Sequence, residues 1–449
     1  MSRREKETQE LNDKLSAHMK IILKSTAPSE KYGRLLLASP PETRYPYVYP
    51  RDTSCAVQLF RRLVGSPAGY DAADDAFELM KSMAHFMKDV QEEDGSWGQR
   101  YHTDGESRHI YAQEDNIAHG VSIIGNYLLA ANRLEKDVPE LDEFLESIRH
   151  ALTHSIEKLY HKELNLFHST TSIHESALES GYTCWVNFAF LYAFSLAHEL
   201  ATLYDEQKAI SPAYLNFRKQ FLHSVSELFM TGDRYIRRIN PEGTMDLRPD
   251  FTLLSPFYFG FLHYKEQMKK SVSYMEKQLT DPEFGMIMRY LPFYDDFAVH
   301  VHAGNGPWLQ YTAVLAQYHF WSGNKKRGDE LLSAIDRYRN DKGEIPEHLS
   351  TCKRFEWFME KEWDPGEDFA KEFHKPILRK DVNFDCILEE ANNMARSYKE
   401  TGSKCIIPDR KHPEGGYIQF ALPLMWSHAE YARALLMREK DWWKSKRGE

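Results

Sequence analysis

The sequence lacks several features that mark common classes of protein. Its 449 residues contain five cysteines, an odd number, and no two of them form a Cys-x-x-Cys pair. Cysteines scattered in this way favour neither structural disulfides nor a zinc site, and they are typical of a protein in the reducing cytoplasm. We therefore expect a cytoplasmic protein that has no structural disulfide.

Other absences exclude further classes. No apolar run reaches the roughly 18 residues of a membrane span, because even residues 185–196 include Asn187 and Ser195. The N-terminus lacks the apolar stretch of a signal peptide. The formal net charge of −10 is the opposite of the basic balance that nucleic-acid binding requires. We expect neither a membrane nor a nucleic acid as a partner. The sequence also lacks the glycine-rich phosphate-binding motifs of nucleotide-binding sheets, so we do not expect such a sheet.

A helical period dominates what is present. Apolar residues recur at spacings of three and four, as in Phe77, Met80, Ala84 and Met87. A turn at Asn240-Pro-Glu-Gly243 predicts a hairpin. The predicted helices are residues 7–24, 52–64, 72–90, 114–135, 139–160, 181–203, 212–229, 250–262, 266–279, 307–322, 325–339, 383–398 and 420–437.

Two kinds of helix are predicted. Residues 181–196 and 308–321 are apolar on most faces, which is typical of buried helices, whereas 139–160 and 325–339 are half polar and suit an outer layer. This alternation predicts an all-α fold, the (α/α)6 barrel. We expect one catalytic domain at 45–437, with a helix and an extended lead-in at 1–44. A charged inserted loop or subdomain is expected at 352–416, before the last helix, and a polar tail at 438–449.

Polar and aromatic clusters lie between these helices. Tyr49, Arg51 and Asp52 precede a helix, where Arg51 and Asp52 form either a cap with an ion pair or the floor of a sugar-binding cleft. Gln113 and Asp115 suit either a helix cap or a substrate contact.

Trp97 belongs to a Gln-x-x-x-Gly-x-Trp pattern that is similar to one in triterpene cyclases, but the cyclase proton-donor motif is absent. The other interpretation of Trp97 is packing on the rim of the barrel.

Carboxylates also precede the most apolar helix. Glu175 and Glu179 either have raised pKa values suited to acid catalysis or only interact with the dipole at a helix N-terminus. His300 and His302, with Asp295 and Asp296, fit either a metal site or a sugar-contacting loop.

Ser427 and His428 are poorly placed for serine catalysis, because neighbouring residues on a helix point about 100° apart and no Gly-x-Ser-x-Gly elbow exists.

The order of these motifs carries more information than any one of them. Tyr49-Pro-Arg-Asp52, Pro346-Glu347 and Trp426-Ser-His-Ala-Glu430, with the clusters between them, resemble the glucoamylase-like glycosidases of glycoside hydrolase family 15. That family includes glucodextranases and trehalases, and the resemblance spans residues 45–437.

The resemblance implies an inverting, exo-acting α-glycoside hydrolase that uses no metal and no cofactor. Glu175 matches the general acid and Glu347 the general base, with Glu179 as a reserve for the acid. The matching substrate-binding residues are Tyr49, Arg51, Asp52, Trp97, Gln113, Asp115, His174, Glu179, Arg289, Trp308 and His348.

This sequence departs from the family at a few of these positions. His174 replaces a tryptophan, His348 replaces a glutamine, and Tyr49 stands where many members have tryptophan. The expected partner is a carbohydrate, but neither its identity nor the oligomeric state is predicted. A lyase or phosphorylase on the same barrel, and a non-catalytic carbohydrate-binding or regulatory protein, remain alternatives.

Overall fold

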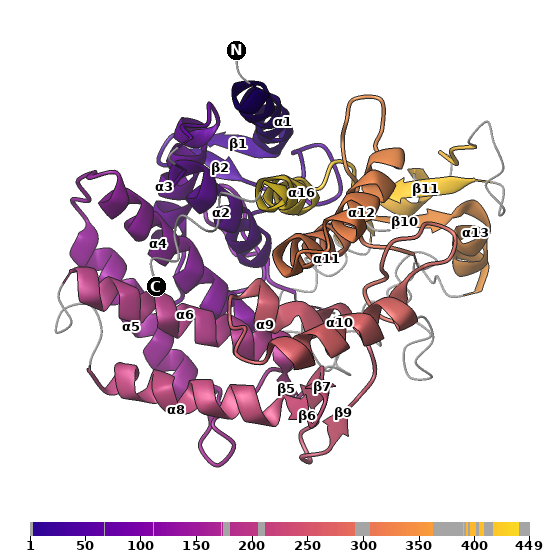
Figure 1. Cartoon of the computed structure of the whole chain (residues 1–449). Helices are drawn as coiled ribbons and strands as arrows, with labels where there is room; N and C mark the ends of the chain where they lie inside the picture. Colours follow the sequence, from indigo (N-terminus) through magenta and orange to yellow (C-terminus); the bar gives the residue numbers. More distant parts are fainter. Residues whose placement is uncertain are drawn as a thin grey trace.

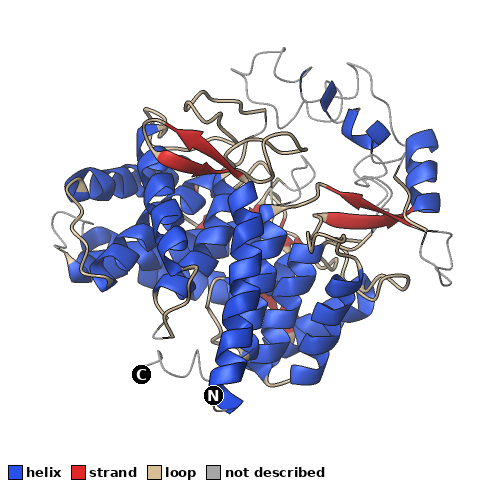
Figure 2. Ribbon diagram, turned by 90° about the horizontal axis from the view of Figure 1, so that it is seen from above, coloured by secondary structure: helices blue, strands red, loops and turns tan. Residues whose placement is uncertain are grey.

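Helices make up most of the molecule, and its strands are few and short (Figure 2). The structure, a computed structural model, describes residues 3–66, 68–110, 112–171, 173, 180–204, 212–291, 306–361, 389, 392–393, 396–400, 404–407 and 416–439.

An inner ring of helices forms the wall around the axis of the molecule. Each inner helix contacts the next, and the last, α16, contacts the first, α2, so that the ring closes. Figure 1 shows α16 between α2 and α11. The ring consists of α2 (Pro50–Val64), α4 (Asp115–Arg133), α6 (Cys184–Leu203), the short η2–α9 segment (Phe251–Leu254 and Ser255–Tyr258), α11 (Leu309–Ser322) and α16 (Met425–Arg438).

An outer helix packs against each part of this ring. The outer layer consists of α1 (Arg3–Lys24), α3 (Ala73–Asp89), α5 (Leu141–Lys158), α8 (Pro212–Leu228), α10 (Lys265–Leu279) and α12 (Lys325–Arg337). The predicted (α/α)6 barrel is thereby confirmed. Helix α1 packs on α16 as its outer partner, so the barrel includes the N-terminal helix that the sequence analysis placed before it.

The sequence explains which helices are inside. In α11 every side chain from Leu309 to Phe320 is buried, whereas α12 buries one stripe that includes Leu331 and Ile335. Helix α11 ends at Gly323, whose φ of 89° is a left-handed conformation that glycine adopts without a steric penalty. Helix α6 is long and apolar enough to cross a membrane, but here it forms part of the inner ring and most of it is buried.

Short antiparallel strands connect the helices. The predicted hairpin at Asn240-Pro-Glu-Gly243 is confirmed, because Ile239 pairs with Met245 across that turn. The pairs are β1 (Thr26–Ser29) with β2 (Gly33–Leu36), β3 (Tyr160–His161) with β4 (Leu166–Phe167), β6 (Met230–Thr231) with β7 (Arg234–Tyr235), and β10 (His348–Thr351) with β11 (Tyr417–Phe420). A three-stranded sheet contains β5 (Tyr182–Thr183), β8 (Arg238–Ile239) and β9 (Met245–Asp246).

The inserted segment begins where β10 ends. Helix α13 (Cys352–Lys361) follows β10 directly, and β11 returns the chain to the barrel, with His348 paired with Phe420. A disulfide joins Cys352 to Cys405 across 53 positions, so the expectation of no structural disulfide is wrong for this pair. No local motif announces the bond, because only folding of the insertion brings its two cysteines together.

Candidate functional site

Several of the predicted site residues lie at the N-terminal ends of inner helices, at one mouth of the barrel. Inner and outer helices alternate along the chain, so the inner helices run parallel and their N-terminal ends lie together. Tyr49, Arg51 and Asp52 are at the start of α2, Gln113 and Asp115 are at the start of α4, and Trp308 caps α11.

Glu347, the predicted base, lies in an aromatic environment at this mouth. Its side chain is 13% exposed, and the Tyr45 hydroxyl donates a hydrogen bond of 3.1 Å to its Oε2. Burial and the neighbouring Glu347 carboxylate raise the pKa of the Tyr45 phenol, so this hydroxyl keeps its proton. Tyr49 packs edge-on against Tyr45 and accepts a hydrogen bond from Arg100. Tyr45 therefore links two of the predicted residues, Tyr49 and Glu347.

His348 extends the cluster, because its Nδ1 lies 3.6 Å from the same Glu347 oxygen, Oε2. Its ring stacks on Trp308 at 4.7 Å between centroids and on Phe420 at 4.2 Å, so it lies between them. The Arg289 guanidinium lies 4.6 Å from the centre of the Trp308 ring. Burial lowers the pKa of His348, which favours a neutral ring in the stack. The structure therefore brings Arg289, Trp308 and His348 together beside Glu347, as the resemblance implies.

A chain of aromatic contacts continues across the mouth toward α4. Trp308 stacks on Tyr311, and Tyr311 stacks on Phe251 at 3.9 Å. Phe251 contacts Trp185, whose indole N–H donates to Asp115 Oδ2 at 3.1 Å. The surroundings of Glu347 and the start of α4 are thus joined by packed rings.

Asp115 binds Arg51 rather than facing an open cleft. Arg51 donates two hydrogen bonds of 2.9 Å, one to each carboxylate oxygen, and both side chains are almost fully buried. Burial alone would raise the pKa of Asp115, but Arg51 and His119 outweigh it and hold the pKa below its usual range. Sequence adjacency suggested that Arg51 pairs with Asp52. The partner is instead Asp115, while Asp52 lies half-buried in the first turn of α2.

Trp97 and Gln113 lie in packed surroundings. The Trp97 indole N–H donates to the Met87 carbonyl at 2.7 Å, and its ring lies so close to Gly120 that a Cβ there would collide with it. Gln113 is buried and accepts a hydrogen bond from Asn116. For Trp97 the structure agrees with the packing interpretation, and no described contact links it to Glu347.

The predicted acid falls outside the described residues, as do His174, Glu179, His300 and His302. The chain on either side of the acid is fixed, because Ser169 and Gly181 pair with each other through two backbone hydrogen bonds. Next to this pair, Thr170 donates its backbone N–H and its hydroxyl to Glu114 at the start of α4. The described residues that precede and follow Glu175 in the sequence therefore lie beside the start of α4.

The backbone around Glu347 is held on both sides. The Glu347 N–H donates to the Phe420 carbonyl at 2.9 Å, and the Glu347 carbonyl accepts from the Leu309 N–H at 3.0 Å. The Ser427 hydroxyl donates to the Pro346 carbonyl at 2.9 Å. Ser427 thus supports the segment that contains Glu347, which agrees with the expectation that it is not a nucleophile.

Sequence reasoning missed two features of this region. Tyr45 lies four residues before Tyr49, but nothing in the sequence indicated that it would contact Glu347. Glu430 ends the Trp426-Ser-His-Ala-Glu430 motif, and the structure buries it fully. Its carboxylate accepts hydrogen bonds from three side chains, those of Tyr258, Gln317 and Arg433. Glu430 therefore stabilises the centre of the barrel.

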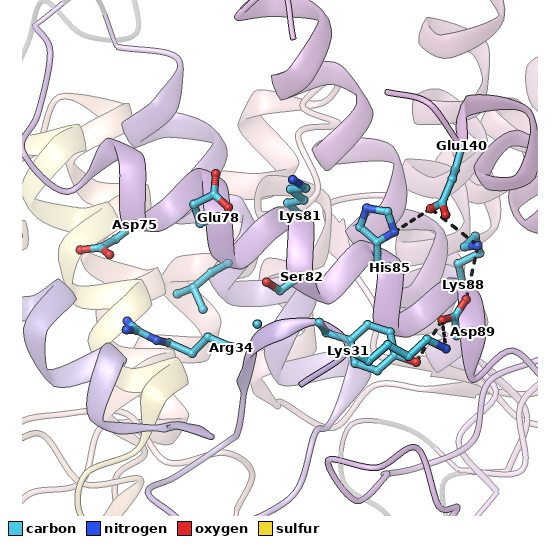
Figure 3. Close-up of a pocket in the computed structure, with 13 residues that line it drawn as sticks. Lys31, Arg34, Asp75, Glu78, Lys81, Ser82, His85, Lys88, Asp89 and Glu140 are labelled. Atoms are coloured by element: carbon cyan, nitrogen blue, oxygen red, sulfur yellow. Dashed lines mark hydrogen bonds and ion pairs between the residues drawn. The ribbon is translucent and has the colours of Figure 1, made fainter. Parts of the chain in front are cut away.

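One hollow on the outer surface lies between the β1–β2 hairpin and α3 (Figure 3). Its volume is about 720 Å³, and none of the predicted site residues lines it. At one end of the hollow the charged side chains pair with one another, as in Lys31 with Asp89 at 2.6 Å and His85 with Glu140 at 2.8 Å. In the part of the chain that the structure describes, no group of three or more His, Cys, Asp or Glu residues could hold a metal ion.

Comparison with solved structures connects this geometry to known proteins. No protein-family model matches the sequence, and no curated protein matches it. A glycosidase structure matches 98% of this chain and 98% of its own, with a TM-score of 0.60 and 14% identity. The chain shares the fold of this glycosidase. The glucoamylase of Saccharomycopsis fibuligera matches 96% of this chain and 95% of its own at a TM-score of 0.58 and 13% identity.

A bacterial glucoamylase complexed with acarbose matches 93% of this chain and 54% of its own, at a TM-score of 0.59 and 14% identity. Another matching structure is a glycosidase variant in complex with glucose. At these identities the comparisons show the fold. The resemblance to glucoamylase-like glycosidases that the motifs indicated is confirmed at that level.

Proposed function

We propose that this protein is an inverting, exo-acting α-glycoside hydrolase that acts on an oligosaccharide or a small α-glucoside. The observation that carries the proposal is the setting of Glu347, a partly exposed carboxylate bound by Tyr45 at an aromatic mouth of a glucoamylase fold. Two of the matching structures are complexes with glucose and with acarbose, and these complexes support a carbohydrate substrate.

In this proposal Glu347 acts as the general base. Its carboxylate takes a proton from a water molecule, whose oxygen attacks the anomeric carbon on the face opposite the leaving group. Glu175, with Glu179 as the reserve candidate, donates a proton to the leaving oxygen. An inverting enzyme holds its two carboxyl groups roughly 6.5–9.5 Å apart, which leaves room for the water.

The aromatic neighbours give the pocket its selectivity. Trp308 stacks on His348 and lies under the Arg289 guanidinium, so its buried ring holds these two side chains in place beside Glu347. The Tyr45 hydroxyl fixes one oxygen of Glu347, so that the carboxylate is oriented before substrate arrives. Arg51, held by Asp115, sets the start of α2 at the pocket floor, where Asp52 is the proposed ligand of the sugar hydroxyls.

The test is hydrolysis of a panel of maltose, isomaltose, trehalose and maltotriose by the purified protein and its variants. Glu347→Gln and Glu175→Gln are each expected to lower kcat about 10²–10⁴-fold, the usual contribution of a general acid or base. Glu276→Gln is the matched control, because the Glu276 carboxylate, like that of Glu347, is partly buried and accepts a hydrogen bond, but it lies on outer helix α10. Near-full activity in both active-site variants would contradict the proposed roles.

Two further outcomes separate the alternatives. Binding of these sugars without turnover by the wild-type protein would indicate a carbohydrate-binding protein. An unsaturated product or a requirement for phosphate would indicate a lyase or a phosphorylase. The cytoplasmic location stays a prediction, and the Cys352–Cys405 bond argues against it, because disulfides persist mainly in oxidising compartments.

A further inference from the structure

Two histidines from opposite ends of the chain meet beneath the segment that contains Glu347. The backbone N–H of Ile345, two residues before Glu347, donates to His428 Nε2 at 2.9 Å. His428 Nδ1 lies 2.9 Å from Nδ1 of His18, which comes from helix α1. Both rings are buried, and the pair spans 410 positions of sequence.

The hydrogen-bond partners determine where the protons of this pair lie. A backbone N–H only donates, so His428 Nε2 must accept and therefore carries no proton. The single proton of neutral His428 then lies on Nδ1 and is donated to His18. It follows that His18 accepts through Nδ1 and carries its own proton on Nε2.

We propose that His18 and His428 are positioning residues for the catalytic base: as a neutral pair with one fixed arrangement of protons, they hold the Ile345 amide and thereby the backbone that places Glu347 at the barrel mouth. This inference rests on the proposed function. It also gives the N-terminal helix a part in catalysis, although α1 contributes no residue to the mouth.

The surroundings keep both rings uncharged. Tyr431 stacks on His18 at 4.8 Å and donates its hydroxyl to Asp336. The cations on this side are Arg339, which lies over the Tyr431 ring, and Lys24, which pairs with Glu344 at 2.9 Å. Burial lowers the pKa of His18 to about 3, and burial together with His18, Arg339 and Lys24 lowers the pKa of His428.

Protonation of the pair would break the arrangement. A protonated His428 carries a hydrogen on both ring nitrogens, so its Nε2–H would oppose the Ile345 N–H. The amide would then lose its acceptor inside the protein, where an unsatisfied donor is costly. The Ser427 hydroxyl and several backbone hydrogen bonds hold Pro346 and Glu347, but they do not replace the hydrogen bond from the Ile345 N–H to His428.

The closing experiment compares paired variants at each position on the sugar panel. His428→Phe removes the acceptor and is expected to lower kcat by about 10²-fold, because a misplacement of about 1 Å costs that much. His428→Gln restores an acceptor and should recover most of the loss. His18→Phe should lower kcat by about tenfold, since the proton on His428 is then free to move to Nε2, whereas His18→Asn should stay within about threefold. In each variant KM should change less than kcat.

His319→Asn is the control, because His319 is equally buried but binds Glu276, away from this segment. It should leave kcat unchanged. Hydrogen exchange of the Ile345 amide gives a readout that does not depend on activity. We expect slow exchange in the wild type and in His18→Asn, and faster exchange in both phenylalanine variants.

The outcomes distinguish this inference from the proposed function. Folded phenylalanine variants with wild-type kcat, or with an Ile345 amide as protected as in the wild type, would overturn the inference. If His428→Phe does not fold, the His18→Phe and His18→Asn pair decides the question in the same way. A wild-type protein that cleaves no sugar would end the proposed function, and the exchange measurement would still decide whether the histidine pair holds Ile345.

Discussion

Replacing Asp115 with asparagine should destabilise this protein severely, independently of any substrate. The carboxylate accepts two hydrogen bonds of 2.9 Å from Arg51 and one of 3.1 Å from Trp185. The side chains of Asp115 and Arg51 are only 2% and 5% exposed, so water cannot replace the lost partner. In Asp115→Asn a neutral amide faces the guanidinium, and one of its two polar atoms is itself a donor.

The expected loss of stability follows from the positive charge of Arg51, which remains buried in the variant. Leaving one member of a buried ion pair without its partner costs about 3–5 kcal/mol. The assay is urea unfolding followed by circular dichroism and by tryptophan fluorescence, with agreement of the two probes as the check on a two-state transition. Glu199→Gln is the control, because Glu199 forms an exposed pair with Arg61 at 3.4 Å and should cost less than about 1 kcal/mol.

Acid pH gives a second signature of the same pair. The native pKa of Asp115 is held below its unfolded value of about 3.9, so the ion pair stabilises the fold fully above that pH. The contribution disappears as pH falls through the native pKa, and the difference between wild type and Asp115→Asn should shrink accordingly. A loss below about 1 kcal/mol at neutral pH would refute the reasoning, since the Asp115 carboxylate would then add little to the stability of the fold.

Three further predictions concern the mouth of the barrel and the insertion. Tyr45→Phe removes the hydroxyl bound to Glu347 and should lower kcat about tenfold, the effect of losing a hydrogen bond to a charged group; steady-state kinetics would contradict this if kcat were unchanged. Trp308→Leu should raise KM for maltose by about tenfold and change kcat less, because it removes the ring that holds His348 and Arg289 in place rather than a reacting group; an effect on kcat alone would argue against that role. Cys352→Ser removes the disulfide that closes a loop of 53 positions and should lower stability by roughly 4 kcal/mol. We expect faster proteolysis within the insertion, and equal cleavage rates in the wild type and the variant would count against a structural role for the bond.

Local patterns were enough to predict most of the fold. Apolar spacing predicted a helix at 307–322, where α11 lies, and its apolar faces indicated that it lies inside. The Asn240-Pro-Glu-Gly243 turn predicted the β8–β9 hairpin. The residues that determine these features are close together in the sequence, so the features do not depend on contacts between distant residues.

Contacts between distant residues were not accessible in the same way. Arg51 and Asp115 are 64 positions apart, and the sequence offered the adjacent Asp52 as an equally reasonable partner. The Cys352–Cys405 bond and the packing of α1 on α16 likewise depend on closure of the barrel. The order of motifs was enough to group Glu347, Trp308 and His348, which the structure places side by side, whereas their roles stay predictions.

The configuration of the first sugar released tests the central claim most directly. Proton NMR should be recorded while the protein cleaves an α-linked glucoside from the panel, before the product mutarotates. If Glu347 activates water on the face opposite the leaving oxygen, the β-anomer of glucose should appear first and the α-anomer should follow only by mutarotation. Release of the α-anomer first would contradict the inverting mechanism and the role assigned to Glu347.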